Sequence, residues 1–263
     1  MKKLIIALSI LALSVTVVPA QAVVPVQAET KSLAIIDSYF DNASVCVALS
    51  GCSISLTSKP ALISSPANHG NGMVEVAKRQ NPELKIVTVR SANTSAKATN
   101  EMTTGDFIRA LAWVNSNPSG IGAVSISRAF NGNKACSPNT AGTAEFGGAS
   151  KADLKVKELI ASLSSKGIPV FAATGNKLGG PVDYPACLPQ TNSVGVGSLN
   201  SSGVMVSSYS FNADTDYFAS ANVYSFKSLL FGLIPNTTSA GNVAVAAKYL
   251  TGSLDGKLVN VTP

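Results

Sequence analysis

The chain has 263 residues, a formal net charge of +6 at pH 7 and 46% hydrophobic residues. This length suits one large α/β domain or two small ones. The positive charge is scattered, without a basic run or interleaved aromatic side chains, so we expect no nucleic-acid partner.

The N-terminus has the pattern of a secretory signal peptide. Lys2 and Lys3 form a basic start, residues 4–18 are almost wholly apolar, and Ala20-Gln21-Ala22 matches a cleavage site. The apolar run is short for a membrane-spanning helix, which favours a cleaved signal over an uncleaved anchor. We expect residues 1–22 to be removed, leaving a secreted, periplasmic or cell-envelope protein without stable membrane insertion.

Strands and helices alternate along the rest of the chain. Residues 23–32 form a short lead, too short for a folded domain, and we expect residues 33–263 to form one domain. Short apolar runs predict buried strands, and helical periodicity with start and stop signals predicts helices. The predicted strands are 33–36, 45–49, 53–57, 85–90, 123–127, 168–172, 193–199, 204–208 and 217–219. The predicted helices are 72–80, 106–115, 151–165 and 238–250, with 45–49 and 53–57 pairing as a small ribbon and loops at 91–104 and 130–150.

This alternation predicts a three-layer α/β fold, in which a mostly parallel central sheet carries helices on both faces. Functional residues in such sheets gather at the carboxyl ends of the strands. Asp37 and Asn176 directly follow predicted strands, so we expect both at that edge.

Four cysteines follow the predicted signal: Cys46, Cys52, Cys136 and Cys187. An even count in an oxidising compartment suggests two disulfides, for which three connectivities are possible. Cys46 and Cys52 bracket a short segment that can turn back at its glycine, which favours the pairs Cys46–Cys52 and Cys136–Cys187. The cysteine spacings do not suit a zinc site and the chain has one histidine, so we assign no metal site.

His69 is that only histidine. Imidazole is the most frequent general base near neutral pH. If this chain catalyses a reaction with a histidine as general base, His69 is the one candidate. A lone histidine is more often a hydrogen-bonded or surface residue without chemistry. Here, however, an aspartate at a predicted strand end precedes it and a serine at a predicted helix start follows it. Asp37, His69 and Ser239 stand in one of the chain orders known for serine hydrolase triads.

Four stretches together resemble the subtilisin-like serine peptidases, the subtilase family. Residues 33–38 (LAIIDS) look like the strand that ends in the triad aspartate, and residues 68–74 (NHGNGMV) look like the segment that opens the triad histidine's helix. Residues 170–176 (VFAATGN) are similar to the strand that delivers the oxyanion asparagine, and residues 238–241 (TSAG) resemble the nucleophile motif. No single motif is specific, but four in the right order across about residues 33–250 are.

The resemblance implies a three-layer subtilisin-like fold and a secreted serine endopeptidase that cleaves polypeptides through an acyl-enzyme. His69 would be the general base, Asp37 would hold its tautomer, and Ser239 would be the nucleophile. Asn176 would donate to the oxyanion. The residues that would contact the substrate are Ser125, Ser127, Ala173 and Gly175. The resemblance implies no organic cofactor; it allows calcium, for which no site can be assigned.

Several departures from the family pattern bear on activity. Thr237 stands at the position where the family has a glycine before Thr-Ser. After Asp37, Ser38-Tyr39 lacks the family's usual glycine, and Arg128-Ala129 replaces a common Leu-Gly. A register shifted by two residues would make Thr237 the nucleophile; we prefer Ser239 because it keeps the Thr-Ser dipeptide and aligns residues 245–246 with the family's Val-Ala. The alternative function is a catalytically inactive domain that binds peptides or a protein partner. A structural cell-envelope protein would leave the triad residues unexplained.

Overall fold

A computed structural model describes residues 30–48, 69–91, 101–102, 104–127, 129–130, 151–176, 182–188, 193–199, 202, 204, 215–219, 237–252, 254 and 258–259. The strands in these ranges are β1 (Ser32–Asp37), β2 (Val45–Cys46), β3 (Ile86–Arg90), β4 (Glu101–Met102), β5 (Ile121–Ile126), β6 (Ala129–Phe130), β7 (Val170–Ala173), β8 (Val194–Ser198), β9 (Tyr217–Ala219) and β10 (Leu258–Val259). The helices are α1 (His69–Gln80), α2 (Thr104–Ser116), α3 (Lys151–Ser165) and α5 (Thr238–Leu250).

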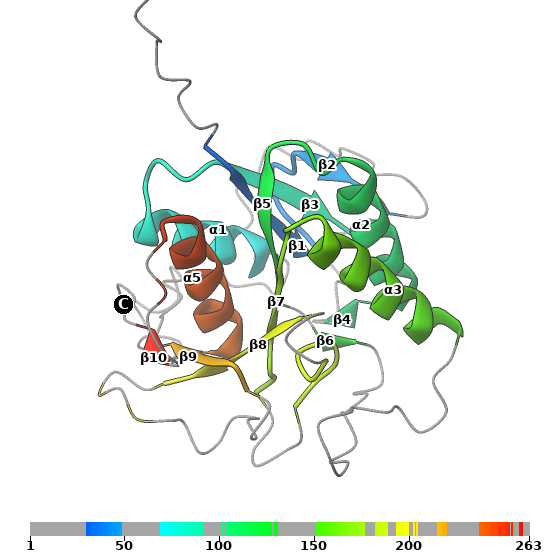
Figure 1. Ribbon diagram of the computed structural model, residues 1–263. Helices are drawn as coiled ribbons and strands as arrows, with labels where there is room; N and C mark the ends of the chain where they lie inside the picture. Colours follow the sequence, from blue (N-terminus) through cyan, green and yellow to red (C-terminus); the bar gives the residue numbers. More distant parts are fainter. Residues whose placement is uncertain are drawn as a thin grey trace, which may run out of the picture.

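Eight of the described strands form one parallel sheet in the order β10-β9-β8-β7-β5-β1-β3-β2, with β1 between β5 and β3. Helices α1 and α5 cover one face of this sheet, and α2 and α3 cover the other (Figure 1). Strands β4 and β6 form a separate parallel pair. The predicted three-layer α/β fold with a parallel central sheet is therefore confirmed.

Strand β1 is buried on both faces, and its residues divide the interior into two cores. All four residues from Leu33 to Ile36 have 0% exposure. Ala34 and Ile36 belong to the core under α2 and α3, whereas Leu33 and Ile35 belong to the core under α1 and α5. Successive side chains of a strand point to opposite faces, so a central parallel strand is apolar throughout. This explains why an uninterrupted apolar run predicted β1.

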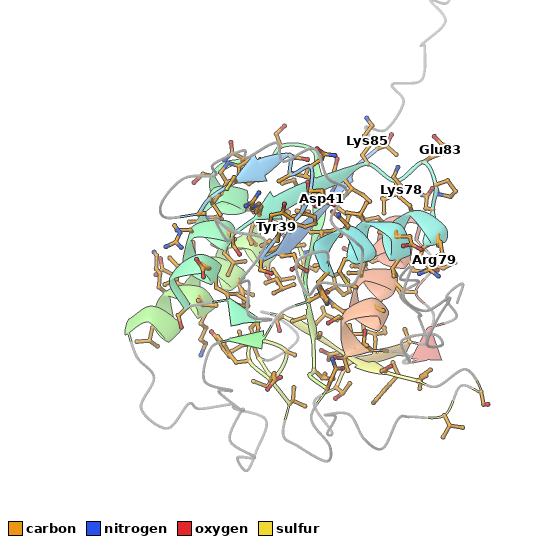
Figure 2. All side chains as sticks on the ribbon, turned by 180° about the vertical axis from the view of Figure 1, so that it is seen from behind. Tyr39, Asp41, Lys78, Arg79, Glu83 and Lys85 are labelled. Carbon is orange, nitrogen blue, oxygen red and sulfur yellow. The ribbon has the colours of Figure 1, made fainter. Side chains whose placement is uncertain are left out.

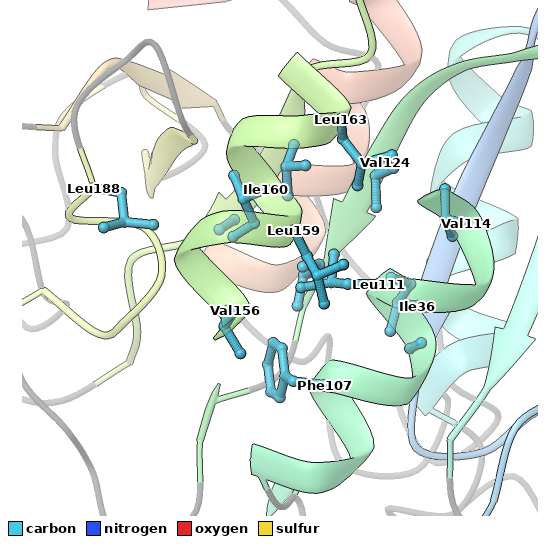
Figure 3. Packing of buried hydrophobic residues seen from close by; sticks show 14 of the residues in the cluster. Ile36, Phe107, Leu111, Val114, Val124, Val156, Leu159, Ile160, Leu163 and Leu188 are labelled. Atoms are coloured by element: carbon cyan, nitrogen blue, oxygen red, sulfur yellow. The ribbon is translucent and has the colours of Figure 1, made fainter. Parts of the chain in front are cut away.

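The core under α2 and α3 consists of large apolar side chains. Figure 3 shows the side chains of the two helices meeting one another above those of the sheet. The labelled members from the helices are Phe107, Leu111, Val114, Val156, Leu159, Ile160 and Leu163. They recur at three- and four-residue spacing, which places them on one face of each helix.

The core under α1 and α5 is built differently, because α5 lies directly against the backbone of the sheet. Every residue from Thr238 to Ala247 is buried, and most are alanine, glycine or valine. A Cβ added at Gly241 would lie 3.0 Å from the Ala219 carbonyl oxygen and 3.2 Å from that of Gly197. Small side chains thus let α5 approach β8 and β9 more closely than a helix of leucines would.

Helix α1 begins at His69, three residues before the predicted start at residue 72. The glycines at 70 and 72 lower the helix propensity of this turn, so the sequence pattern favours a start after them. In the structure Gly70 faces the chain that leaves β1: a Cβ added there would lie 2.3 Å from the Tyr39 carbonyl oxygen. Glycine therefore allows the first turn of α1 to lie against this segment.

The predicted strand at 45–49 is shorter in the structure and pairs in parallel with β3. The Ser44 amide donates to Thr88 Oγ1 (2.7 Å), and the Val47 amide donates to the Arg90 carbonyl (2.9 Å). Residues 53–57, its expected ribbon partner, lie outside the described residues, as does most of 204–208. The predicted loop at 91–104 contains β4, which pairs with β6 just before the second predicted loop.

The predicted signal peptide lies outside the described residues. Cys46 and Cys187 are each disulfide-bonded. Their expected partners, Cys52 and Cys136, also lie outside the described residues, so the pairing stays a prediction.

Leu111→Ala tests the core under α2 and α3, with Leu154→Ala as its control. Leu111 is fully buried, whereas Leu154 on α3 is 54% exposed. Removing the Leu111 side chain leaves a cavity and should lower the free energy of unfolding by about 2–5 kcal/mol. Leu154→Ala should change it by less than about 0.5 kcal/mol. Urea unfolding of both variants measures this difference, and equal effects would contradict the described packing.

Candidate functional site

Asp37 ends β1, and its carboxylate is fully buried. Its Oδ1 accepts hydrogen bonds from the Ser38 amide (2.7 Å) and the Ser38 hydroxyl (3.2 Å). Its carbonyl accepts from the Ser91 amide (3.0 Å) and the Ser91 hydroxyl (3.2 Å), which ties the end of β1 to the segment after β3. The carboxylate therefore has a fixed orientation, with Oδ2 left for another partner.

That partner is His69, the first residue of α1. Its Nδ1 lies 2.6 Å from Asp37 Oδ2. The His69 side chain is 24% exposed, so the imidazole lies between the buried carboxylate and solvent. A carboxylate accepts hydrogen bonds, so it favours the tautomer with the proton on Nδ1 and leaves Nε2 as an acceptor. The structure thus brings two of the predicted site residues, Asp37 and His69, into hydrogen-bond contact.

Ser239, in the first turn of α5, is tied to the end of β5. Its hydroxyl donates to the Ser127 carbonyl (3.0 Å), and the Ser127 hydroxyl donates to the Ser239 carbonyl (3.1 Å). Within the described part of the chain, no hydrogen bond joins Ser239 to His69. The structure therefore brings Asp37 and His69 into contact and holds the Ser239 hydroxyl on Ser127.

Asn176 follows β7, is exposed, and binds the N-terminus of α5. Its Oδ1 accepts from the Thr238 amide (3.0 Å) and the Thr238 hydroxyl (2.9 Å), and the Gly175 amide donates to Thr238 Oγ1 (3.2 Å). An amide N–H donates only to an acceptor, so these contacts fix which end of the Asn176 side chain is oxygen. Gly175 has φ +106°, a conformation that favours glycine, and this turns the chain toward Thr238. The Nδ2 donor of Asn176 is left for other partners.

Thr237 is the N-cap of α5. It has φ −110° and ψ 153°, and its hydroxyl oxygen accepts from the Ala240 amide (3.2 Å). This is the usual way in which a threonine side chain satisfies an amide of the first helical turn. Thr237 therefore has a structural role at the position that the shifted register would make the nucleophile.

The predicted substrate-contacting residues differ in accessibility. Ser125 is fully buried, and its hydroxyl accepts a hydrogen bond from a side chain of α5. Ser127 is also buried, whereas Ala173 is half-buried at the end of β7. A substrate would therefore reach the Ser125 position through backbone atoms at most.

The donor to Ser125 is Asn242, which the sequence analysis missed. Asn242 is fully buried, and its Nδ2 donates to Ser125 Oγ (2.9 Å), the Ile126 carbonyl (3.1 Å) and Ser127 Oγ (3.3 Å). The signal in the sequence was an amide within a run of alanine, valine and glycine. Its partners lie more than 110 residues away along the chain, so helical periodicity does not reveal them.

Arg90 is a buried cation at the end of β3. Arg90 is paired with Asp37 across the β1–β3 ladder, and its guanidinium carbon lies 4.2 Å from the centroid of the Tyr39 ring. Burial lowers the pKa of Arg90, while Tyr39 and Asp41 act in the opposite direction. Tyr39, which stands where the family has glycine, thus covers the guanidinium. Figure 2 shows Tyr39 and Asp41 beside β1, away from the charged residues at the other end of α1.

A cavity of ≈ 970 Å³ lies away from these residues, at the edge of the sheet where β5 begins. Lys31, Trp113 and Lys166 are among the residues that line it, and none of its lining residues belongs to the candidate site. Among the described residues, no group of three or more histidine, cysteine, aspartate or glutamate side chains could hold a metal ion.

Comparisons with known proteins agree with this architecture. No family model and no curated protein matches the chain. A lanthipeptide protease matches with a TM-score of 0.56 and 15% identity over 84% of this chain and 73% of its own. The nisin leader peptidase NisP from Lactococcus lactis matches at 0.55 and 15% over 85% and 77%. A cold-adapted subtilisin-like serine proteinase matches at 0.51 and 21% over 86% and 78%. The chain therefore has the subtilisin-like fold that its motifs predict.

Gly70→Ala tests whether the contact between α1 and the segment after β1 positions His69. In an unconstrained helix this change would be stabilising by about 1 kcal/mol. Here the new Cβ would lie 2.3 Å from the Tyr39 carbonyl oxygen, so the first turn of α1 must move away from β1. We expect the free energy of unfolding to fall by about 1–3 kcal/mol, as in overpacked cores.

Thermal unfolding measures the effect of Gly70→Ala against Glu75→Ala, an exposed position on the same helix. The control should lie close to the parent protein. A Gly70→Ala protein as stable as the parent would show that α1 does not depend on this contact.

Proposed function

We propose that this chain is an exported serine endopeptidase that hydrolyses peptide bonds through an acyl-enzyme on Ser239. The observation that carries the proposal is the 2.6 Å contact between the His69 imidazole and the buried Asp37 carboxylate at the carboxyl edge of a subtilisin-like sheet. A carboxylate without solvent exposure stabilises a cation in contact with it more strongly than an exposed one does. This suits a base that becomes positively charged during the reaction.

The proposed reaction uses His69 first as a base and then as an acid. Its Nε2 accepts the Ser239 proton while Ser239 Oγ attacks the peptide carbonyl carbon, and Asp37 stabilises the imidazolium. The imidazolium then donates a proton to the leaving amine. In the second half, His69 takes a proton from a water molecule whose oxygen attacks the acyl carbon. The imidazolium then gives this proton to Ser239 Oγ as the acyl C–O bond breaks and the product acid leaves. For the first step the Ser239 hydroxyl must turn from the Ser127 carbonyl toward His69.

The oxyanion of each tetrahedral intermediate would be stabilised at the N-terminus of α5. Thr238 binds the oxygen of the Asn176 side chain, so the Asn176 Nδ2 would be the donor to the oxyanion. The first turn of a helix adds unpaired amides and a dipole that favour negative charge. Loss of one such donor typically lowers kcat by about 10²–10³-fold.

A polypeptide is the proposed substrate, and export is the proposed route to it. Two of the compared structures are named as a lanthipeptide protease and a leader peptidase, which supports a peptide substrate here. The basic start, apolar run and Ala20-Gln21-Ala22 support export with removal of residues 1–22, leaving the peptidase domain at residues 33–263. The described residues contain no helix long and apolar enough to cross a membrane.

One observation favours a second candidate function, a catalytically inactive domain that binds peptides. The Ser239 hydroxyl donates to a backbone carbonyl and has no hydrogen bond with the imidazole among the described residues. A domain held in this arrangement would keep the peptide-binding edge of the fold but would not form an acyl-enzyme.

Labelling with a fluorophosphonate probe separates the two functions and the two nucleophile registers. The probe reacts with an activated serine, so the mature protein should be labelled. Ser239→Ala should abolish labelling, whereas Thr237→Ala should keep at least part of it while losing up to about 1–2 kcal/mol of stability with its cap. His69→Ala should leave almost no labelling, because the hydroxyl is a weak nucleophile without its base.

Labelling that survives Ser239→Ala and is lost in Thr237→Ala would assign the nucleophile to Thr237. A folded mature protein that is not labelled and cleaves no casein-type substrate would favour the inactive, peptide-binding domain.

Intact-mass measurement of the exported protein tests the processing and the disulfides. Its mass under non-reducing conditions should equal that of the chain without residues 1–22, less four hydrogens. Peptide mapping should then recover Cys46 linked to Cys52 and Cys136 linked to Cys187. Alkylation of unreduced protein at any cysteine would show that the two-disulfide assignment is wrong.

A further inference from the structure

Asn242 is an amide at the centre of an otherwise apolar helix. It is fully buried between α5 and the end of β5. The Ile126 carbonyl can only accept, so its contact at 3.1 Å identifies the donor end of the Asn242 side chain as Nδ2. The same Nδ2 reaches the hydroxyl oxygens of Ser125 and Ser127 at 2.9 and 3.3 Å.

Stability alone does not account for an amide at this position. Burial of a polar atom without a hydrogen-bond partner is costly, and asparagine is a weak helix former. Its Oδ1 has no hydrogen-bond partner among the described residues. Its neighbours Val243 and Ala246 show that apolar side chains fill this core. Hydrogen bonds are directional, so they restrict the relative position of two elements more than apolar contacts do. An amide at this position can therefore orient α5 relative to β5.

The hydrogen bonds of Asn242 bear on the position of Ser239. Asn242 lies one helical turn after Ser239, on the same side of α5. The Ser127 hydroxyl accepts from Asn242 and donates to the Ser239 carbonyl, and the Ser239 hydroxyl donates to the Ser127 carbonyl. Asn242 therefore contacts Ser127, the residue that is hydrogen-bonded to Ser239 in the first turn of α5.

We propose that Asn242 is a positioning residue for the nucleophile. It holds Ser127 against the first turn of α5 and so fixes the position from which the Ser239 hydroxyl turns toward His69 in the proposed reaction. This inference rests on the proposed function, since it assigns Asn242 a role through Ser239. Without the amide, only the two hydrogen bonds between Ser127 and Ser239 hold the end of β5 to the start of α5 among the described residues, so the two can shift against each other.

Asn242→Ala tests this role, with Val245→Ala as the matched control. Val245 is fully buried in the same helix and the same core and has no part in the hydrogen bonds around Ser239. Both variants lose buried contacts and should unfold at lower temperatures than the parent. A displacement of about 1 Å costs about 100-fold in rate, so we expect Asn242→Ala to slow fluorophosphonate labelling about 10- to 100-fold. Val245→Ala should label within threefold of the parent.

The kinetics with a peptide substrate give a second readout. A variant that only unfolds more easily loses active enzyme but keeps the KM of the folded fraction. Asn242→Ala, assayed at a temperature at which it is folded, should have a lower kcat with KM within about threefold of the parent. Asn242→Ser, which keeps a hydroxyl donor on α5, should recover part of the labelling rate. Asn242→Leu, which keeps the size of the side chain and has no donor, replaces Asn242→Ala if that variant does not fold.

Each outcome decides between the two proposals. If the parent is labelled and Asn242→Ala, or Asn242→Leu in its place, is labelled at the same rate, the positioning role is wrong and the proposed function stands. If Val245→Ala slows labelling as much as Asn242→Ala, the effect is general loss of packing and the role is also wrong. If the parent itself is not labelled, the proposed function fails, and the positioning role fails with it.

Discussion

The buried carboxylate of Asp37 is the constraint on which the candidate site depends. A carboxylate removed from water destabilises the fold unless its oxygens have hydrogen-bond partners. Ser38 supplies two donors to one oxygen, and His69 contacts the other. Because His69 opens α1, this contact forms only when that helix begins beside the end of β1. Gly70 allows this approach, so the pairing and the helix start depend on each other.

The site lies where the two cores of the molecule meet the carboxyl edge of the sheet. β1 and β5 contribute side chains to both cores, so neither strand can shift without disturbing both layers of helices. α5 adds the second half of the site, with Asn176 and Thr238 joined at its N-terminus and Ser127 and Ser239 joined in its first turn. The residues that would act on a substrate are thus held by elements that also hold the fold together.

The sequence predicted the fold well because the relevant signals are local. The apolar run 33–36 identified a strand buried on both faces, and the Ala-rich run 238–250 identified a buried helix with its limits. Asp37 and Asn176 each follow a predicted strand, and the carboxyl ends of parallel strands lie at the same edge of a sheet. Both residues could therefore be predicted to lie at that edge. The start of α1 was missed because the contact that makes Gly70 favourable involves Tyr39, about thirty residues earlier.

Asn242 is a residue whose role could not be predicted from the sequence. An asparagine in an apolar helix is visible in the chain, but its meaning depends on Ser125, Ile126 and Ser127. Only the packing of α5 on β5 brings these groups together. In the same way, the sequence suggested that Ser239 serves as a nucleophile but gave no sign that its hydroxyl rests on the Ser127 carbonyl.

The burial of α5 also limits how such a protein can diversify. A helix whose residues 238–247 are all enclosed, and whose Gly241 lies against the backbone of two strands, tolerates few substitutions. Changes that alter the chemistry at its first turn would at the same time disturb the interior. Substitutions would therefore accumulate more slowly in α5 than at the exposed positions of the described helices.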